Sequence, residues 1–223
     1  MKRLWIIVGG FAAGVALMLG FMQPWKRPPR RPAPSPQTDD RTRALDHASQ
    51  ALAALKAGDL MEAQARLSKA ASLDPDLFEI PLYQGHIEML AGGHSAARRS
   101  YDEALKRRPG DAKALAGRAA ARFELREYAG AIEDATAAIA TEPDALFTRA
   151  AAYGALERNE ESVRDWTAYL AQRPKDAHAW MNRGNAHERL GRMSAAVADW
   201  KQALILDSNL AAQLNPLILE AEK

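Results

Sequence analysis

The chain of 223 residues contains no cysteine, so it has no disulfide, no thiolate metal site and no cysteine nucleophile. Its five histidines form no pair three or four positions apart, which is the spacing of helical metal motifs. These residues are His47, His86, His94, His178 and His187. No G-x-S-x-G, Walker or dinucleotide-binding glycine pattern occurs either. We therefore expect no enzyme activity, no metal and no cofactor.

Charge is distributed unevenly along the chain. Residues 1–43 contain eight Lys/Arg and two Asp, a local charge of +6, which leaves residues 44–223 at −4. A nucleic-acid-binding domain would concentrate Lys and Arg on its own surface. The basic residues here belong to the N-terminal arm, so nucleic acid is not an expected partner.

Residues 4–22 carry no charge and predict a membrane-spanning helix. Nineteen residues at about 1.5 Å each cross the hydrocarbon core of a bilayer. A cleaved signal peptide is the alternative, but the apolar run is long for one and no A-x-A site precedes Gln23. We therefore expect the first domain to be residues 1–23, an uncleaved signal anchor in the inner membrane of a bacterial cell. Gly10 and Gly14 form a G-x-x-x-G pair that would allow helix dimerisation, although such a pair is weak evidence.

Residues 24–43 are rich in proline and arginine and predict an extended linker between the membrane and the body. Lys and Arg lie on both sides of the apolar run, so the positive-inside rule leans only slightly to a cytoplasmic body. A short N-terminal tail before an apolar run usually remains inside, and the residues after the run are exported. We expect a periplasmic body, with the cytoplasmic side as the alternative.

The rest of the sequence repeats with a period of 34 residues. Pro75, Pro109, Pro143 and Pro174 are separated by 34, 34 and 31 residues. Small residues recur at fixed distances before these prolines; one such position holds Ala51, Gly85, Ala119, Ala150 and Gly184. Gly58, Gly92 and Gly191 lie midway through their units. This pattern predicts pairs of closely packed helices, with a turn at the glycine and a helix end at the proline.

The pattern resembles the tetratricopeptide repeat (TPR) family, most fully in the fifth unit. That unit has Trp180, Gly184, Gly191, Ala196, Trp200 and Ala203 at the signature positions. Leu67 and Ala135 stand where an aromatic residue is usual, and Tyr169 stands where a small residue is usual. The resemblance implies an all-α solenoid of five repeats over residues 44–208. The repeats are 44–77, 78–111, 112–143, 144–176 and 177–208, and residues 209–223 form a capping helix that Pro216 restarts or kinks.

Arginine and aspartate occur together in the last three units. Arg118, Arg149 and Arg183 occupy one position of the first helix, and Asp134, Asp165 and Asp199 follow sixteen residues later. The first two units have Gln50 and Gln84 at the arginine position and Arg66 and Ser100 at the aspartate position. An ion pair between the two helices of each unit is the simplest explanation; an arginine row facing an acidic ligand is the alternative.

In TPR proteins the first helices of the repeats line a concave groove that holds a peptide. The resemblance places these residues in the groove: Leu82, His86, Met89, Phe123, Phe147, Met181, Asn185, Glu188 and Arg189. Some of them could instead pack between repeats. A carboxylate clamp of the chaperone-binding type needs Lys and Asn where this chain has Ala48 and Leu52. We expect a membrane-tethered adaptor or assembly chaperone that binds a protein or peptide; a permanent structural subunit of a membrane complex is the alternative.

Overall fold

The structure is a computed structural model that describes residues 36–222. The predicted anchor at residues 4–22, the Gly10–Gly14 pair and most of the linker lie outside these residues and stay predictions. Between residues 36 and 222, no helix is both long enough and apolar enough to cross a bilayer.

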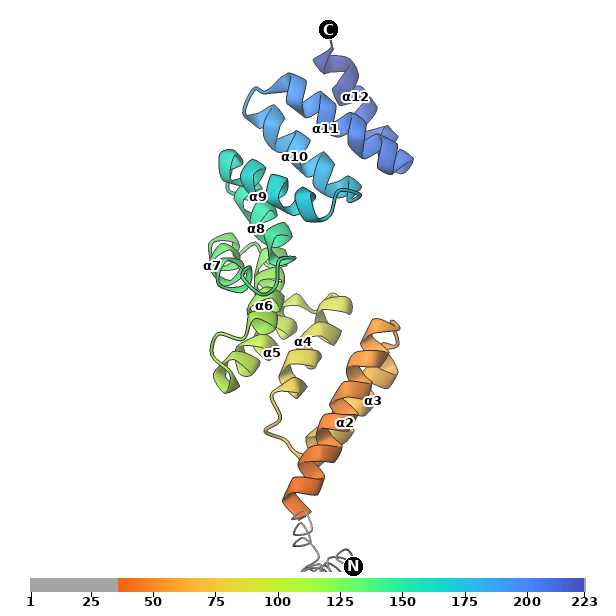
Figure 1. The fold of residues 1–223 in the computed structure, drawn as a ribbon, viewed down its shortest axis with the longest axis vertical. Coiled ribbons are helices and arrows are strands. Elements are labelled where there is room, and N and C mark those ends of the chain that lie inside the picture. The colour runs from red at the N-terminus through yellow and green to blue at the C-terminus, as the bar shows by residue number, and fades with distance from the viewer. Residues whose placement is uncertain (1–35, 223) are drawn as a thin grey trace, which may run out of the picture. The chain divides into compact units, whose positions relative to one another are not determined.

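The described residues form eleven α-helices and one short 3-10 helix, so the all-α repeat prediction is confirmed (Figure 1). Their bounds are α2 (Pro36–Lys56), α3 (Leu60–Leu73), α4 (Glu79–Leu90), α5 (His94–Arg107), α6 (Ala112–Glu124), α7 (Tyr128–Ala138), α8 (Ala145–Ala155), α9 (Asn159–Gln172), α10 (Ala177–Arg189), α11 (Met193–Leu206), η1 (Ser208–Leu210) and α12 (Ala211–Ala221). The predicted ranges from 78 to 208 each contain one helix pair, and the first pair, α2 and α3, begins at Pro36, before the predicted start at residue 44. We call the first helix of each pair (α2, α4, α6, α8, α10) helix A and the second helix B.

Residues 39–223 make one compact unit in which successive helices pack together. The helices A from α4 to α10 also contact one another directly, as stacked hairpins require. The core is a series of apolar clusters along the stack, and the last one joins α11 to α12 through Leu210, Leu214 and Ile218. Helix α12 thus covers the final apolar face.

Glycine on helix A permits close packing against an aromatic ring on helix B. A Cβ on Gly184 would lie 2.6 Å from Cδ1 of Trp200, and a Cβ on Gly85 would lie 2.7 Å from Cε1 of Tyr101. Both rings are fully buried. The small residues of the repeat pattern therefore set the spacing between helices A and B.

The turn between helices A and B has one backbone conformation in all five repeats. Gly58, Gly92 and Gly191 have φ of 78°, 76° and 70°, and the residues at the same position in repeats three and four are Arg126 and Glu157. These two also have positive φ, 61° and 58°. The turn therefore has the left-handed backbone conformation in every repeat, including the two in which the residue is not glycine and the conformation costs free energy.

Three places in the chain differ from expectation or from the regular repeat. Residues 36–43 are helical rather than extended, because α2 begins at Pro36, whose fixed φ and missing N–H suit a first helical position. The spacing of 31 rather than 34 residues between Pro143 and Pro174 is accommodated at the start of repeat four, where α8 (Ala145–Ala155) has 11 residues and α6 and α10 have 13 each. At the C-terminus, Pro216 lies within α12, which continues through it and does not restart there; a kink at Pro216 stays a prediction.

Candidate partner-binding surface

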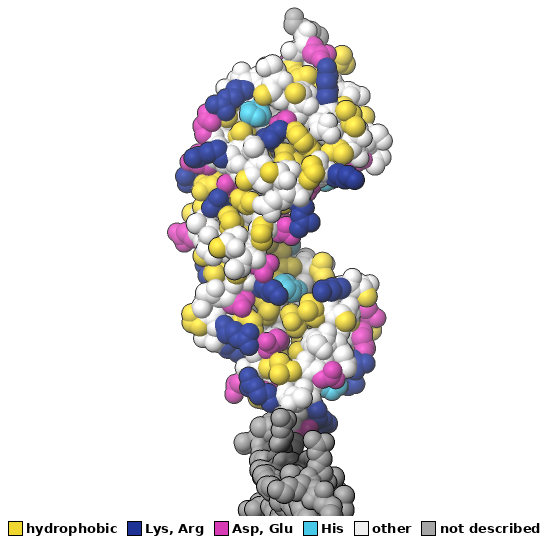
Figure 2. All heavy atoms as spheres, viewed as in Figure 1, with side chains coloured by type: hydrophobic (Ala, Val, Ile, Leu, Met, Phe, Trp, Pro, Cys, Tyr) yellow, Lys and Arg dark blue, Asp and Glu magenta, His cyan; other side chains and the backbone are white. Residues whose placement is uncertain are grey.

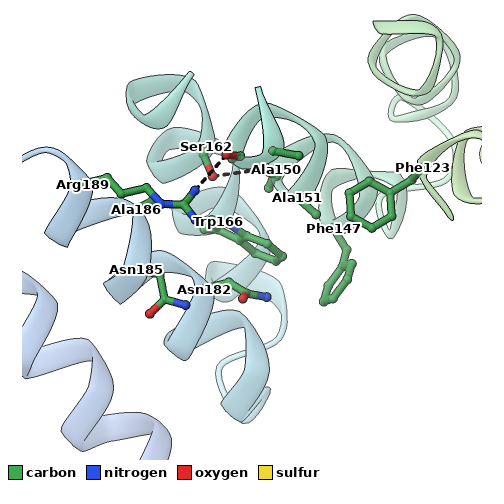
Figure 3. Close-up of a pocket in the computed structure, with 12 residues that line it drawn as sticks. Phe123, Phe147, Ala150, Ala151, Ser162, Trp166, Asn182, Asn185, Ala186 and Arg189 are labelled. Carbon is green, nitrogen blue, oxygen red and sulfur yellow. Dashed lines mark hydrogen bonds between the residues drawn. The ribbon is translucent and has the colours of Figure 1, made fainter. Parts of the chain in front are cut away.

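Two hollows lie along the helices A, and most of the predicted groove residues line one or the other. The first, which has the larger number of lining residues, is a cavity of about 290 Å³ that we call the fourth-repeat hollow (Figure 3). Its lining consists of Phe123, Phe147, Ala150, Ala151, Gly154, Ala155, Ser162, Trp166, Asn182, Asn185, Ala186 and Arg189. It therefore brings together Phe123, Phe147, Asn185 and Arg189 of the predicted set.

Aromatic rings form one side of the fourth-repeat hollow. The ring of Phe147 on α8 meets Trp166 edge-on, with centroids 4.9 Å apart, and meets Tyr169 at 5.5 Å. Trp166 is almost fully buried, so it is a core residue at the floor of this side. The Tyr169 hydroxyl donates to Asp176 Oδ2 at 3.0 Å, and burial raises the pKa of Tyr169 to about 12. The rings of Phe147, Trp166 and Tyr169 thus pack against one another on this side of the hollow.

Helix α10 supplies the polar side of the fourth-repeat hollow. Arg189 projects from it toward α8 and α9, and Asn182 and Asn185 line the hollow from the same helix (Figure 3). Arg189 Nη1 donates to the carbonyl of Gly154 at 2.9 Å, and Asn185 Oδ1 accepts from Trp200 Nε1 at 2.9 Å. Because this bond identifies Oδ1 as the atom that faces Trp200, the NH2 group of Asn185 points the other way and can donate to a ligand.

The second hollow lies between α2 and α4, and we call it the first-repeat hollow. It measures about 320 Å³ and is lined by Leu52, Leu55, Lys56, His86, Met89 and Leu90. His86 packs between Tyr83 and Tyr101, with ring centroids 6.2 Å and 5.7 Å away. Burial, and to a lesser extent Lys113, lowers the pKa of His86 and so favours the neutral ring. This hollow is apolar apart from Lys56 and His86.

Three predicted groove residues line neither hollow. Leu82 is only 3% exposed, belongs to the core cluster around Tyr101, and borders a separate pocket at the starts of α4 and α6. Met181 packs against the cluster that α11 and α12 form. Glu188 is half-buried on α10. Position on the inner face of helix A did not by itself distinguish these residues. Leu82 packs into the core between α4 and α5, and Met181 packs against the cluster at the end of the stack.

The three arginine–aspartate pairs lie between helices A and B of their repeats. Arg183 Nε and Nη2 donate to Asp199 at 2.7 Å each, and Arg118 contacts Asp134 at 2.7 Å through the same two nitrogens. Arg149 does the same with Asp165, at 2.6 and 2.8 Å. Each pair has the two-pronged geometry that matches a guanidinium to a carboxylate.

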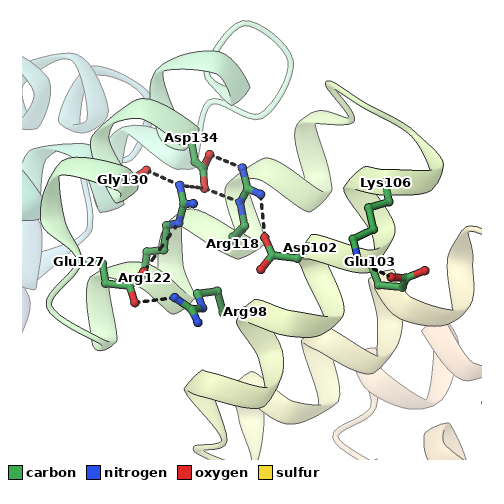
Figure 4. Close-up of polar contacts among 9 residues, drawn as sticks. All are labelled: Arg98, Asp102, Glu103, Lys106, Arg118, Arg122, Glu127, Gly130 and Asp134. Carbon is green, nitrogen blue, oxygen red and sulfur yellow. Dashed lines mark hydrogen bonds and ion pairs between the residues drawn. The ribbon is translucent and has the colours of Figure 1, made fainter.

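The remaining nitrogen of each guanidinium bonds to the preceding repeat. Arg118 Nη1 donates to Asp102 Oδ1 at 2.8 Å (Figure 4). Arg149 and Arg183 donate in the same way to Thr136 and Thr167, at 3.1 and 3.3 Å. These three acceptors occupy one position of helix B. Each arginine therefore joins three helices from two repeats, an arrangement that the pairing pattern in the sequence did not predict.

The pairs are more buried than surface ion pairs. Asp134, Asp165 and Asp199 are 5%, 8% and 5% exposed. Hydrogen bonding to Asp134, the largest effect, raises the pKa of Arg118 above its ordinary value. Arg122 also donates to Asp134 at 2.8 Å and lies beside Glu127, which contacts Arg98 (Figure 4). The arginines are thus occupied by structural partners, which leaves no row of free guanidinium groups for an acidic ligand at these positions.

The sequence pattern that defines the family named "Tetratricopeptide repeat" matches residues 82–145 and 147–211, more than half of the chain. The chain belongs to the tetratricopeptide repeat family. TPR repeats are scaffolds for protein–protein interaction and are typically not enzymes. The part of the chain that the structure describes contains no group of three or more His, Asp or Glu side chains placed to hold a metal ion.

Solved structures share the fold of this TPR chain at low sequence identity. A crystal structure of MamA is 22% identical, with a TM-score of 0.61, covering 76% of this chain and 94% of that one. MamA from Desulfovibrio magneticus RS-1 is 19% identical, with a TM-score of 0.65 and coverages of 75% and 96%. YrrB, described as a TPR protein with an unusual peptide-binding site, is 17% identical, with a TM-score of 0.63 and coverages of 80% and 91%. No curated protein matches the chain.

Proposed function

We propose that this TPR protein is a membrane-tethered adaptor that holds an extended segment of a partner protein along its helices A. The observation that carries the proposal is the pair of hollows on that surface, which lie apart and are lined by aromatic, aliphatic and amide side chains. Such surfaces suit peptide recognition because apolar pockets fix side chains and a few polar groups fix orientation. The peptide-binding site that the YrrB structure describes adds a precedent within the same fold.

The tether part of the proposal rests on the uncharged run at residues 4–22. Anchoring would raise the local concentration of the body at the membrane and thereby favour weak partners. We propose a bacterial inner-membrane location with a periplasmic body. Reporter fusions at the C-terminus test this side: activity of a reporter that works only after export supports it, and activity of a cytoplasmic reporter alone refutes it.

Affinity capture of the full chain from native membranes tests partner binding. Leu90 in the first-repeat hollow and Met61 on α3 are both large apolar side chains on the surface, with exposed fractions of 63% and 87%. Leu90→Asp should lose the captured protein, whereas Met61→Asp should retain it. Equal capture by both variants would contradict binding at the helices A.

The same capture distinguishes an adaptor from a permanent subunit. An adaptor should release several different proteins when the salt concentration is raised or a competing peptide is added. One stoichiometric protein that resists high salt would support the structural-subunit alternative.

A further inference from the structure

The fourth-repeat hollow occurs where repeat four departs from the other repeats. Its inner helix carries Ala151, Gly154 and Ala155 at the positions that hold His86, Met89 and Leu90 in repeat two. The small side chains leave the space open above Trp166 and beside Phe147. The first-repeat hollow is lined by the same positions of repeats one and two, but there the bulkier Leu52, Leu55 and Lys56 stand in place of these three small residues. The small side chains on α8 therefore distinguish the fourth-repeat hollow.

Tyr169 contributes a second departure at the same place. Its position holds a fully buried alanine in the other repeats: Ala70, Ala104, Ala138 and Ala203. In repeat four the larger ring packs against Phe147, and its hydroxyl bonds to Asp176. Asp176 also caps α10 by accepting from the backbone N–H of Ala179 at 3.0 Å. Tyr169 thus ties the start of α10 to the aromatic side of the hollow.

The charge and polarity of the hollow indicate what fits it. Arg189 is the one charged residue in the lining, and no carboxylate is part of it. The guanidinium group of Arg189 has five N–H donors and uses one of them for the carbonyl of Gly154, which is the single side-chain hydrogen bond of Arg189 within the described residues. Asn182 and Asn185 add amide groups at the same edge. A bulky apolar group in the hollow would contact its aromatic and aliphatic side chains. A hydrogen-bond acceptor or negative charge beside that group would lie near the N–H donors of Arg189 and the two asparagines.

We propose that the fourth-repeat hollow binds a large apolar side chain, aromatic or aliphatic, from an extended partner segment that carries a carboxylate close to it, with Arg189 binding that carboxylate. This inference rests on the proposed function, since it names the chemistry of the segment held there. The volume of about 290 Å³ lies at the lower end of the range for ligand pockets, as one inserted side chain requires. A basic segment would place its charge against Arg189 and is excluded by the proposal.

The probe is a phage-displayed library of random dodecapeptides, selected on the full chain in lipid nanodiscs. Enriched peptides are then synthesised with a fluorescent label and titrated by anisotropy. The proposal predicts enrichment of a bulky apolar residue with Asp or Glu within a few positions. Changing that acidic residue to its amide should weaken binding about tenfold to the natural chain, and far less to Arg189→Gln.

Two matched substitutions locate the binding. Ala151→Trp fills the hollow and should weaken binding more than about tenfold, whereas Ala120→Trp changes the same position one repeat earlier, outside the hollow, and should not. Unchanged circular dichroism and melting temperature establish that both variants fold. Enriched peptides that are basic, or that bind Ala151→Trp as well as Ala120→Trp, would overturn this inference while peptide binding itself stands. A library that yields no binding peptide would contradict both this inference and the proposed function.

Discussion

Arg183 and Asp199 form a two-pronged ion pair that joins helices A and B of the fifth repeat, with both hydrogen bonds at 2.7 Å. Because the pair is largely buried, its loss should cost more than loss of a surface pair. Removing only Arg183 (Arg183→Leu) leaves a buried carboxylate unpaired and should lower the free energy of unfolding by about 3 kcal/mol. Urea denaturation measures this loss.

The matched control is the double variant Arg183→Leu/Asp199→Leu, which removes both charges. It should be less destabilised than the sum of the two single variants, because each single variant leaves an unpaired charge and the double variant leaves none. Additive losses would mean that the two residues act independently and that the pair does not hold the helices together.

The turn residue Glu157 predicts a stabilising substitution. It has φ of 58°, where repeats one, two and five have glycine. Glu157→Gly should raise the free energy of unfolding by about 1 kcal/mol, because it removes the steric cost of the left-handed conformation. Gly191→Ala is the reverse control: nothing lies within 4 Å of an added Cβ there, so any loss of about 1 kcal/mol comes from the backbone alone. A destabilised Glu157→Gly would show that the side chain contributes more than its conformation costs.

Gly184 predicts a packing cost with a specific rescue. Gly184→Ala places a methyl group 2.6 Å from Trp200 and 3.2 Å from the carbonyl of Ala196, so it should destabilise by about 1–3 kcal/mol. Combining it with Trp200→Leu should cost less than the two changes do separately, since the smaller side chain accepts the methyl group. Strict additivity in thermal or urea unfolding would argue against direct contact.

His187 predicts a pH dependence of stability. Burial lowers its pKa; Asp199 opposes this shift, Arg183 and Arg192 add to it, and Glu160 opposes it. Below its ordinary pKa of about 6.5 the unfolded chain takes up a proton that the folded chain resists. The free energy of unfolding should therefore fall as the pH falls from about 6.5 toward the lower folded pKa. His187→Gln should flatten this part of the profile, and an unchanged slope would exclude His187 as its source.

Much of the fold could be predicted from the sequence because it is encoded locally and repeatedly. The small residues and the turn glycines recur at fixed positions, and each specifies a helix crossing or a turn without reference to distant contacts. The start of α2 at Pro36 was missed because proline is typical both of extended linkers and of first helical positions. The third contact of each arginine was missed because it crosses to the preceding repeat; alignment of Asp102, Thr136 and Thr167 could have revealed it.

The candidate surface was only partly predictable for a different reason. Residues on one face of a helix can point into a hollow or into a neighbouring helix, and the sequence position is the same in both cases. Phe147 lines a hollow whereas Leu82, at the same position of repeat two, is core. Asn182 and Gly154 were not foreseen at all. The run of small residues on α8, together with Tyr169, was the signal that could have located the hollow.

The most direct test of partner binding along the helices A is photocrosslinking in native membranes. A photoreactive amino acid replaces Phe123, at the fourth-repeat hollow, or Ala137, exposed on helix B of the third repeat. Binding along the helices A predicts discrete crosslinked products from position 123, identifiable by mass spectrometry, and none of them from position 137. The same products from both positions, or none from position 123, would contradict it.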